Sequence, residues 1–237
     1  MIEEFEKFVN SFDINEKKIK LKYSHSLRVQ KLCEAIAQDE KFDEHDFKVA
    51  SVVGLLHDYG RFYQWTKYKT FKDKISIDHG DYAASELFEN GKIKDFYQNE
   101  DDYQIIYEAI KYHNKYEVSK NVISKTMCDI IRDADKLDIL YMYTINELKL
   151  EEDGEISEKV KKIFYNHQLL NNKYVNSKID KSIRTLCLVY DLNFKYSYKY
   201  LKENKIIQNI YEILEQKEKF KPYFDEINKF IESKIGD

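Results

Sequence analysis

The sequence has little of what punctuates β structure. Its 237 residues include one proline and six glycines, too few for the many tight turns of a β-sandwich. Long hydrophobic runs are also missing, because the longest strongly apolar stretch, residues 49–56, is far too short to span a bilayer. The start of the chain, Met-Ile-Glu-Glu, is acidic where a signal peptide is basic. We therefore expect an all-α protein in the cytoplasm, with no membrane partner.

Cysteine is scarce, and there is no excess of positive charge. Cys33, Cys128 and Cys187 lie far apart in apolar contexts, and their odd number favours buried free thiols in a reducing compartment. The formal net charge is −4, with both signs interspersed along the chain. A duplex-binding surface needs a basic stripe to neutralise phosphates, so duplex nucleic acid is not an expected partner. A nucleotide-sized anion needs only a local positive cluster and stays compatible.

Apolar residues instead recur at helical spacing. They predict helices at about 24–39, from a cap at Asp43 to Gly60, from a cap at Asp78 to about 90, and around 106–113 and 127–138. Residues 61–77 are expected to form a loop. Further helices are predicted near 177–193, 205–216 and 222–235, the last starting at Pro222. The charged segment 151–155 would separate a core, residues 1–150, from a C-terminal helical extension, residues 151–237, that packs on it as one compact unit.

The strongest local signal for chemistry is His57-Asp58, which follows a segment that is apolar nearly all round. Burying the two side by side is costly unless charge is neutralised, and a helix C-terminus favours a bound cation. His25 lies upstream on an amphipathic helix, and Asp135 downstream in Asp-Ala-Asp-Lys-Leu-Asp, residues 133–138. Aspartate is disfavoured inside helices, so these acids need an explanation. The presence of Asp133 and Asp138 is explained equally well by exposed ion pairs with Lys and Arg and by a role in a functional site.

In order and spacing, these residues resemble the HD-domain superfamily of metal-dependent phosphohydrolases. The resemblance rests on His25, on His57-Asp58 and on Asp135 in an Ala-Asp-Lys-Leu context, over about residues 22–141. It implies a helical bundle with additional C-terminal helices, and it makes Asp135 a metal ligand rather than Asp133.

The positions of His79 and His113 resemble those of the additional histidines in HD proteins that bind two metals. Asp58 would then bridge one ion on His25, His57 and Asp135 and a second ion on His79 and His113. With a single ion, His79 or His113 would face the substrate as an acid or base. The remaining interpretation is that His79 and His113 are core histidines whose ring nitrogens have hydrogen-bond partners within the protein. His45 and His167, in polar surroundings, are expected on the surface.

Imidazole and carboxylate ligands suit one or two divalent ions of Fe, Mn, Ni, Co, Zn or Mg. Such a centre can activate water for attack on phosphorus, with Asp58 as the central catalytic carboxylate. Arginine is rare, so Arg61 and Arg132 stand out; we expect Arg61 to bind the substrate anion and Arg132 to hold a carboxylate. Lys136, beside Asp135, is a further candidate for phosphate contact and catalysis. Gln64, in the aromatic-rich segment 61–73, is the polar side chain expected to contact the substrate.

The predicted activity is therefore hydrolysis of a phosphate ester or anhydride of a small molecule, a nucleotide among the candidates. An HD-fold di-iron oxygenase is the alternative, because its set of four histidines and two aspartates resembles this one. A non-catalytic regulatory protein ranks third, since all six positions carry side chains able to bind metal. Tyrosine-rich C-terminal helices would cover the core or form the surface of a homodimer.

Overall fold

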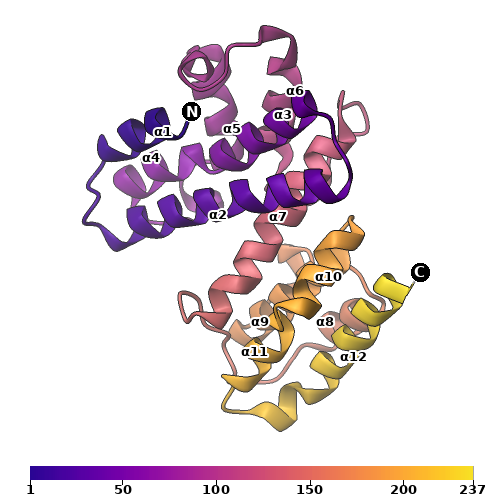
Figure 1. Cartoon of the computed structure of the whole chain (residues 1–237). Helices are drawn as coiled ribbons and strands as arrows, with labels where there is room; N and C mark the ends of the chain where they lie inside the picture. The colour runs from indigo at the N-terminus through magenta and orange to yellow at the C-terminus, as the bar shows by residue number, and fades with distance from the viewer. Residues whose placement is uncertain (237) are drawn as a thin grey trace. The chain divides into compact units, whose positions relative to one another are not determined.

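Helices and their connections make up the described chain. The computed structural model describes residues 1–236, and no strand occurs in that range, which confirms the prediction of an all-α fold. The α-helices in chain order (Figure 1) are α1 (Ile2–Asn10), α2 (Lys17–Asp39), α3 (Glu44–Leu56), α4 (Tyr59–Tyr68), α5 (His79–Ala84), α6 (Tyr103–Tyr112), α7 (Lys125–Thr144), α8 (Glu158–Tyr165), α9 (Lys178–Leu186), α10 (Lys195–Glu203), α11 (Ile206–Glu212) and α12 (Lys217–Gly236).

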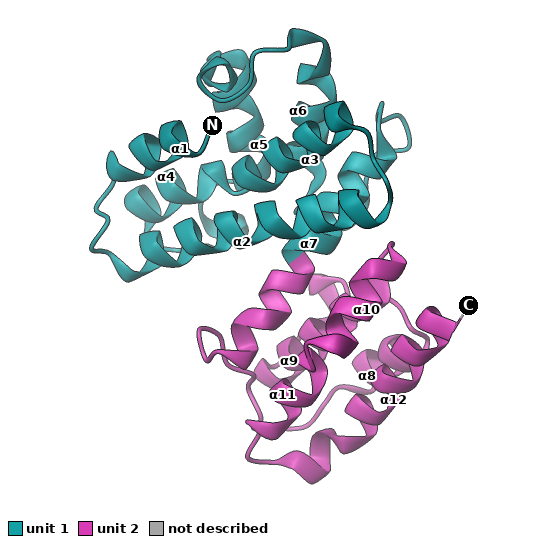
Figure 2. Ribbon diagram, in the orientation of Figure 1, with its two compact units in different colours: residues 1–135 teal, residues 136–237 magenta. Residues whose placement is uncertain are grey.

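The chain divides into two compact units, residues 1–135 and residues 136 onward (Figure 2). The division falls inside α7, earlier in the chain than the predicted boundary near residue 150. All six predicted metal ligands belong to the first unit, which carries α1 to α6 and the first half of α7. The expected packing of residues 151–237 on the core stays a prediction.

Helix α3 is a buried central helix of the first unit. Every residue from 49 to 56 is buried, as the apolar run predicts. It packs closely against α2 because Gly54 has no side chain: a Cβ there would lie 2.8 Å from the Cα of Gln30 and 2.9 Å from the Sγ of Cys33. His57 and Asp58 follow directly, so the burial of α3 carries them into the interior.

Several predicted helix boundaries are confirmed by capping contacts. The carboxylate of Asp43 accepts a hydrogen bond from the N–H of Asp46 at 2.8 Å, and Asp78 accepts from the N–H groups of Gly80 and Asp81. The segment that begins at Asp78 continues past α5 as a π-helical turn, Ser85–Glu89, before a left-handed glycine at position 91.

Other boundaries differ from the predictions. Helix α2 begins at Lys17, not near residue 24, and Pro222 lies inside α12 rather than at its start. Residue 218, four positions before this proline, is exposed, so water can bind the carbonyl that lacks a helical partner. The prediction of one loop over residues 61–77 is wrong for 61–68, which belong to α4.

The prediction that Gly60 ends a helix is wrong, because Gly60 lies in the first turn of α4 and is not left-handed. A Cβ at this position would lie 2.4 Å from the carbonyl oxygen of His79 and 3.3 Å from the backbone nitrogen of Ala83. The glycine therefore allows α4 and α5 to approach closely. This approach brings the residue just before α4, Asp58, to the side chain that begins α5, His79.

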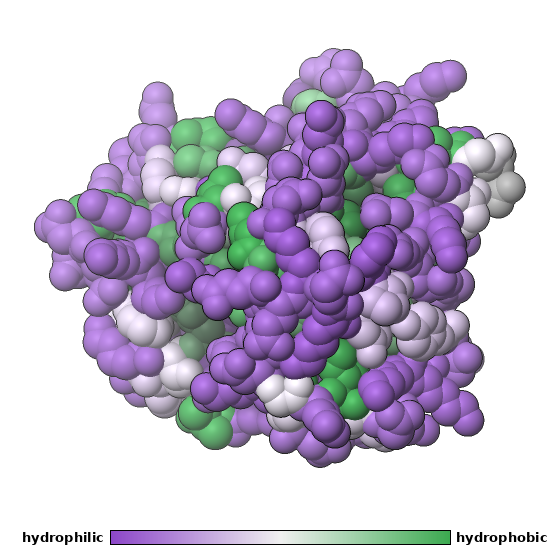
Figure 3. Space-filling view, turned by 90° about the horizontal axis from the view of Figure 1, so that it is seen from below, coloured by the Kyte–Doolittle hydropathy of each residue, from purple (hydrophilic) through white to green (hydrophobic). Residues whose placement is uncertain are grey.

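The apolar side chains are largely buried. In Figure 3 hydrophilic residues cover most of the visible face, and hydrophobic residues form small separate groups. Cys33, Cys128 and Cys187 are buried free thiols, as predicted. Among the described residues, no helix combines the length and the apolar character needed to cross a bilayer.

Candidate metal centre

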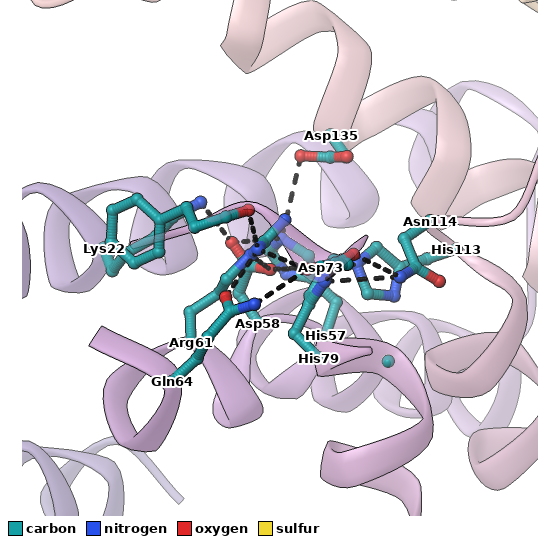
Figure 4. A network of polar contacts seen from close by, with 12 residues as sticks. Lys22, His57, Asp58, Arg61, Gln64, Asp73, His79, His113, Asn114 and Asp135 are labelled. Atoms are coloured by element: carbon teal, nitrogen blue, oxygen red, sulfur yellow. Dashed lines mark hydrogen bonds and ion pairs between the residues drawn. The ribbon is translucent and has the colours of Figure 1, made fainter. Parts of the chain in front are cut away.

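The six predicted ligands converge at Asp58, although they come from five different places in the first unit. His57 ends α3 and Asp58 precedes α4, while His79 begins α5 and His113 follows α6. Helices α2 and α7 supply the other two, His25 and Asp135. The four histidines and Asp58 are each at most 6% exposed, and the side chain of Asp135 is 19% exposed. Figure 4 shows the polar side chains gathered around Asp58.

One oxygen of Asp58 faces the first group of ligands. Its Oδ2 lies 3.4 Å from Nε2 of His25 and 3.6 Å from Nε2 of His57. The Oδ1 of Asp135 lies 3.1 Å and 3.7 Å from the same two nitrogens. The two imidazole nitrogens are 3.2 Å apart. This spacing suits neighbouring ligands of one ion, because two nitrogens each about 2.1 Å from a metal lie about 3.0–3.4 Å apart.

The other oxygen of Asp58 faces the second group. Its Oδ1 lies 3.3 Å from Nε2 of His79 and 3.7 Å from Nε2 of His113. These two nitrogens are 3.0 Å apart. Asp58 thus stands between two sets of donor atoms and presents a different oxygen to each, as a carboxylate that bridges two ions would.

Hydrogen bonds at the outer ring nitrogens show that these donors fit a cation. Nδ1 of His79 lies 2.9 Å from a carboxylate oxygen of Asp73, and Nδ1 of His113 lies 2.6 Å from the carbonyl oxygen of Ile110. Both oxygens only accept hydrogen bonds, so each Nδ1 carries the proton and each neutral ring has a bare Nε2. Two nitrogen lone pairs and an oxygen of Asp58 therefore face one another in a buried space, which a bound cation would stabilise.

Burial sets the charges of the centre. It lowers the pKa of His57 to about 3 and that of His79 to about 4, so both rings are neutral near pH 7. Burial opposes ionisation of Asp58, but the nearby Lys22 ammonium holds its pKa well below the usual value. The pKa of Asp135 is lowered against the same opposition, chiefly by His25. Neutral imidazole and ionised carboxylate are the forms that bind metals.

Three further residues of the centre were missed from sequence. The ammonium of Lys22 lies 2.6 Å from Oδ2 of Asp58, and Asp73 and Asn114 lie behind His79. Lys22 stands three positions before His25 on one helix, a spacing that places two side chains on the same face and offered a signal. Asp73 and Asn114 lie in connecting segments, which have no helical periodicity that could have indicated them.

The predicted substrate-binding residues have partners within the protein. Nη1 of Arg61 donates to Gln64 Oε1 at 2.6 Å, to the carbonyl of Phe71 at 2.8 Å and to Asp73 Oδ1 at 2.9 Å. Gln64 is fully buried, and the ammonium of Lys136 lies 2.8 Å from Oδ2 of Asp191. Their roles toward a substrate stay predictions.

The other charged residues and histidines singled out from the sequence lie outside the group of six. Asp133 and Asp138 are 0% and 1% exposed, so the interpretation of them as exposed ion-pairing residues is wrong. One N–H of Arg132 donates to the carbonyl of residue 115 at 2.5 Å. His45 and His167 are exposed, as expected.

Comparison with known protein families agrees with this geometry. The family model of the HD domain matches residues 23–140, the segment that contains all six ligands. Through this domain the chain belongs to the HD superfamily of metal-dependent phosphohydrolases, whose members bind divalent metals. Comparisons with curated proteins and with solved structures gave no match.

Proposed function

We propose that the protein is a metal-dependent phosphohydrolase that cleaves a phosphate ester or anhydride of a small molecule, with a nucleotide among the candidate substrates. The arrangement of Asp58 carries this proposal, because its two oxygens face two separate groups of buried metal-binding atoms. His25, His57 and Asp135 would hold one ion and His79 and His113 the other. Two divalent ions would supply Lewis acidity toward phosphoryl oxygens and an acidified water as nucleophile.

The protein's own charges support an anionic substrate. Two divalent ions against Asp58 and Asp135 would leave about two positive charges at the centre, which matches a phosphate monoester dianion. Lys22 and Arg61 add positive charge on either side of Asp58, with Nζ of Lys22 2.6 Å from one oxygen and Nε of Arg61 3.5 Å from the other. The Nε group of Arg61 is buried, faces Asp58 and makes no hydrogen bond within the described residues, so Arg61 would attract a substrate anion through its charge. A phosphate contact by Lys136 would require its ammonium to leave Asp191.

Metal content tests this proposal first. The protein would be purified without added metal or chelator, alongside Asp58→Ala and the surface control Asp46→Ala, and bound metals measured by elemental analysis. We expect about two ions per chain in the parent and the control, and a large loss in Asp58→Ala, because the bridging carboxylate serves both ions. The metal found would then be used to screen nucleotides and other phosphate esters for release of inorganic phosphate. A parent protein that neither retains metal nor binds added Mn²⁺, Fe²⁺ or Ni²⁺ would overturn the proposal.

A di-iron oxygenase is the second candidate, because the four histidines and two aspartates gathered here would serve that chemistry equally. Iron as the sole bound metal, with oxygen uptake and no phosphate release, would support it over hydrolysis.

A further inference from the structure

Asp73 lies on the far side of His79 from Asp58. It begins a short 3₁₀ turn, η1 (Asp73–Ile75), in the connection from α4 to α5. Its Oδ2 accepts the hydrogen bond from Nδ1 of His79 at 2.9 Å, while Nε2 of the same ring lies 3.3 Å from Oδ1 of Asp58. A charged oxygen therefore contacts each nitrogen of this buried ring.

This arrangement differs from that of two other histidines of the centre. Nδ1 of His57 bonds to the carbonyl of Gly54 at 2.9 Å, and Nδ1 of His113 bonds to the carbonyl of Ile110 at 2.6 Å. Both acceptors are backbone groups three residues earlier in the chain. His79 instead meets the carboxylate of a side chain, Asp73, whose other oxygen accepts from the guanidinium of Arg61 and the amide of Gln64. An anionic acceptor makes the opposite nitrogen a stronger electron donor than a carbonyl does.

The carboxylates are also unevenly divided. The group of His25 and His57 has Asp135 to itself and shares Asp58. Among the described residues, the group of His79 and His113 has only the shared Asp58 as a carboxylate within 4 Å of its Nε2 atoms. Asp73 supplies the second negative charge near this group, one imidazole ring away from the place of the ion. A divalent ion is stabilised by such a charge because the buried surroundings screen it weakly.

The orientation of Asp73 is fixed by buried donors. Its Oδ1 accepts from Nη1 of Arg61 and from Nε2 of Gln64, each at 2.9 Å. The amide of Gln64, which is fully buried, also donates to the hydroxyl of Ser76 at 2.8 Å and to the carbonyl of Ile77 at 2.9 Å. These contacts occupy one oxygen of Asp73 and leave the other aimed at His79.

We propose that Asp73 is a positioning residue that strengthens ion binding at the half-site formed by His79, His113 and Asp58, and that Arg61 and Gln64 act on this half-site by holding Asp73. The inference rests on the proposed metal centre and deepens it. It assigns to Arg61 and Gln64 a structural role, the orientation of Asp73, that does not depend on a substrate. The half-site of His25, His57 and Asp135 should depend on Asp73 only weakly.

Titration with Co²⁺ alone tests the inference without any substrate. The metal-free parent, Asp73→Asn and the control Asp46→Asn would be followed by calorimetry and by visible absorption of the bound cobalt. Asp46 is a matched control because it also bonds to a histidine, His45, at 3.0 Å, but on the surface. We expect two binding events in the parent and the control. In Asp73→Asn one of them should weaken about 10–100-fold while the other stays nearly unchanged.

The outcomes separate this inference from the proposed function. A parent that takes up no Co²⁺ or other divalent ion overturns the metal centre itself. Two unchanged affinities in Asp73→Asn, or an equal loss at both sites, overturn only the role of Asp73. Asp73→Glu keeps the charge and should recover part of the lost affinity; a loss as large as that of Asp73→Asn would also count against the inference. Circular dichroism in excess chelator shows that each variant keeps its helices.

Discussion

Lys22 supplies a cation to the centre whether or not metal is bound. Its ammonium lies 2.6 Å from Oδ2 of Asp58, and the side chain is only 13% exposed. That oxygen is the one that would bind the ion of the His25 half-site. In the metal-free protein Lys22 therefore neutralises a buried carboxylate, whereas a bound divalent ion would take over this task. The importance of Lys22 for stability should then depend on metal.

We predict that Lys22→Met destabilises the metal-free protein by roughly 3–5 kcal/mol, the usual cost of removing one partner of a buried ion pair. In saturating Co²⁺ the loss should be much smaller. Denaturant unfolding can be followed by fluorescence of Trp65, the single tryptophan, which lies in α4. Lys48→Met is the control, because Lys48 pairs with Glu44 on the surface and should contribute less than about 1 kcal/mol. Equal losses with and without Co²⁺ would contradict the prediction.

At the scale of helices, the approach of α4 to α5 sets the geometry around Asp58. A Cβ on Gly60 would lie 2.4 Å from the backbone oxygen of His79, and a backbone atom cannot move aside as a flexible side chain can. We predict that Gly60→Ala costs about 1–3 kcal/mol of unfolding free energy, as overpacking does, and weakens Co²⁺ binding at the His79 half-site. Unfolding by Trp65 fluorescence and the cobalt titration measure the two effects.

Gly236→Ala is the control for this substitution, because a Cβ there meets no atom within 4 Å. A Gly60→Ala protein with the stability and both cobalt affinities of the parent would show that the helices can separate without consequence for the centre.

The same pair of helices shows what sequence could and could not predict. Local periodicity indicated α3. The order and spacing of His25, His57-Asp58 and Asp135 indicated the metal centre. Both are patterns that can be read from the sequence alone. Helix α4 was missed since it buries a polar residue, Gln64, and carries a glycine in its first turn, a residue that commonly ends helices. The purpose of that glycine depends on the carbonyl of His79, nineteen residues later, which no local pattern reveals.

Asp73 escaped prediction for a related reason. It lies in a connection without helical periodicity, and only the fold shows that it faces a buried histidine. Arg61 was correctly singled out as unusual, but the ordinary chemistry of arginine fits a substrate anion and a structural carboxylate equally. The structure supplies the carboxylate, at 2.9 Å. Sequence patterns therefore indicated the residues that gather around Asp58 better than the residues that orient them.

For the molecule as a whole, the buried histidines link stability to pH. The pKa values of His57 and His79 in the folded protein, about 3 and about 4, lie below the ordinary value of 6.5. Between those values and about 6.5 the unfolded chain binds protons that the folded chain excludes. The free energy of unfolding of the metal-free protein should therefore fall as the pH is lowered from about 6.5 to about 4, by up to about 1.4 kcal/mol per pH unit for each ring.

The low pKa values of Asp58 and Asp135 extend this loss to still lower pH, because they contribute stability above about 4 that disappears as the carboxylates become protonated. His45 acts in the opposite direction, but only at higher pH: hydrogen bonds to Asp46 and Asp102 raise its pKa, so its contribution to stability grows as the pH falls towards about 6.5 and stays constant below that value. We expect His79→Gln to flatten the pH dependence between about 6.5 and about 4, and His45→Gln to leave the slope in that range unchanged.

Urea unfolding at about pH 7 and about pH 5 in excess chelator, read by the fluorescence of Trp65, measures this slope for the unit that contains the centre. Added Co²⁺ at about 100 times its dissociation constant should raise the free energy of unfolding by about 2.7 kcal/mol per site at the higher pH. The gain should shrink at the lower pH, since protons compete for the same nitrogens. A stability that is flat between the two pH values, in chelator and in Co²⁺ alike, would mean that these imidazoles are neither buried as neutral rings nor available to metal.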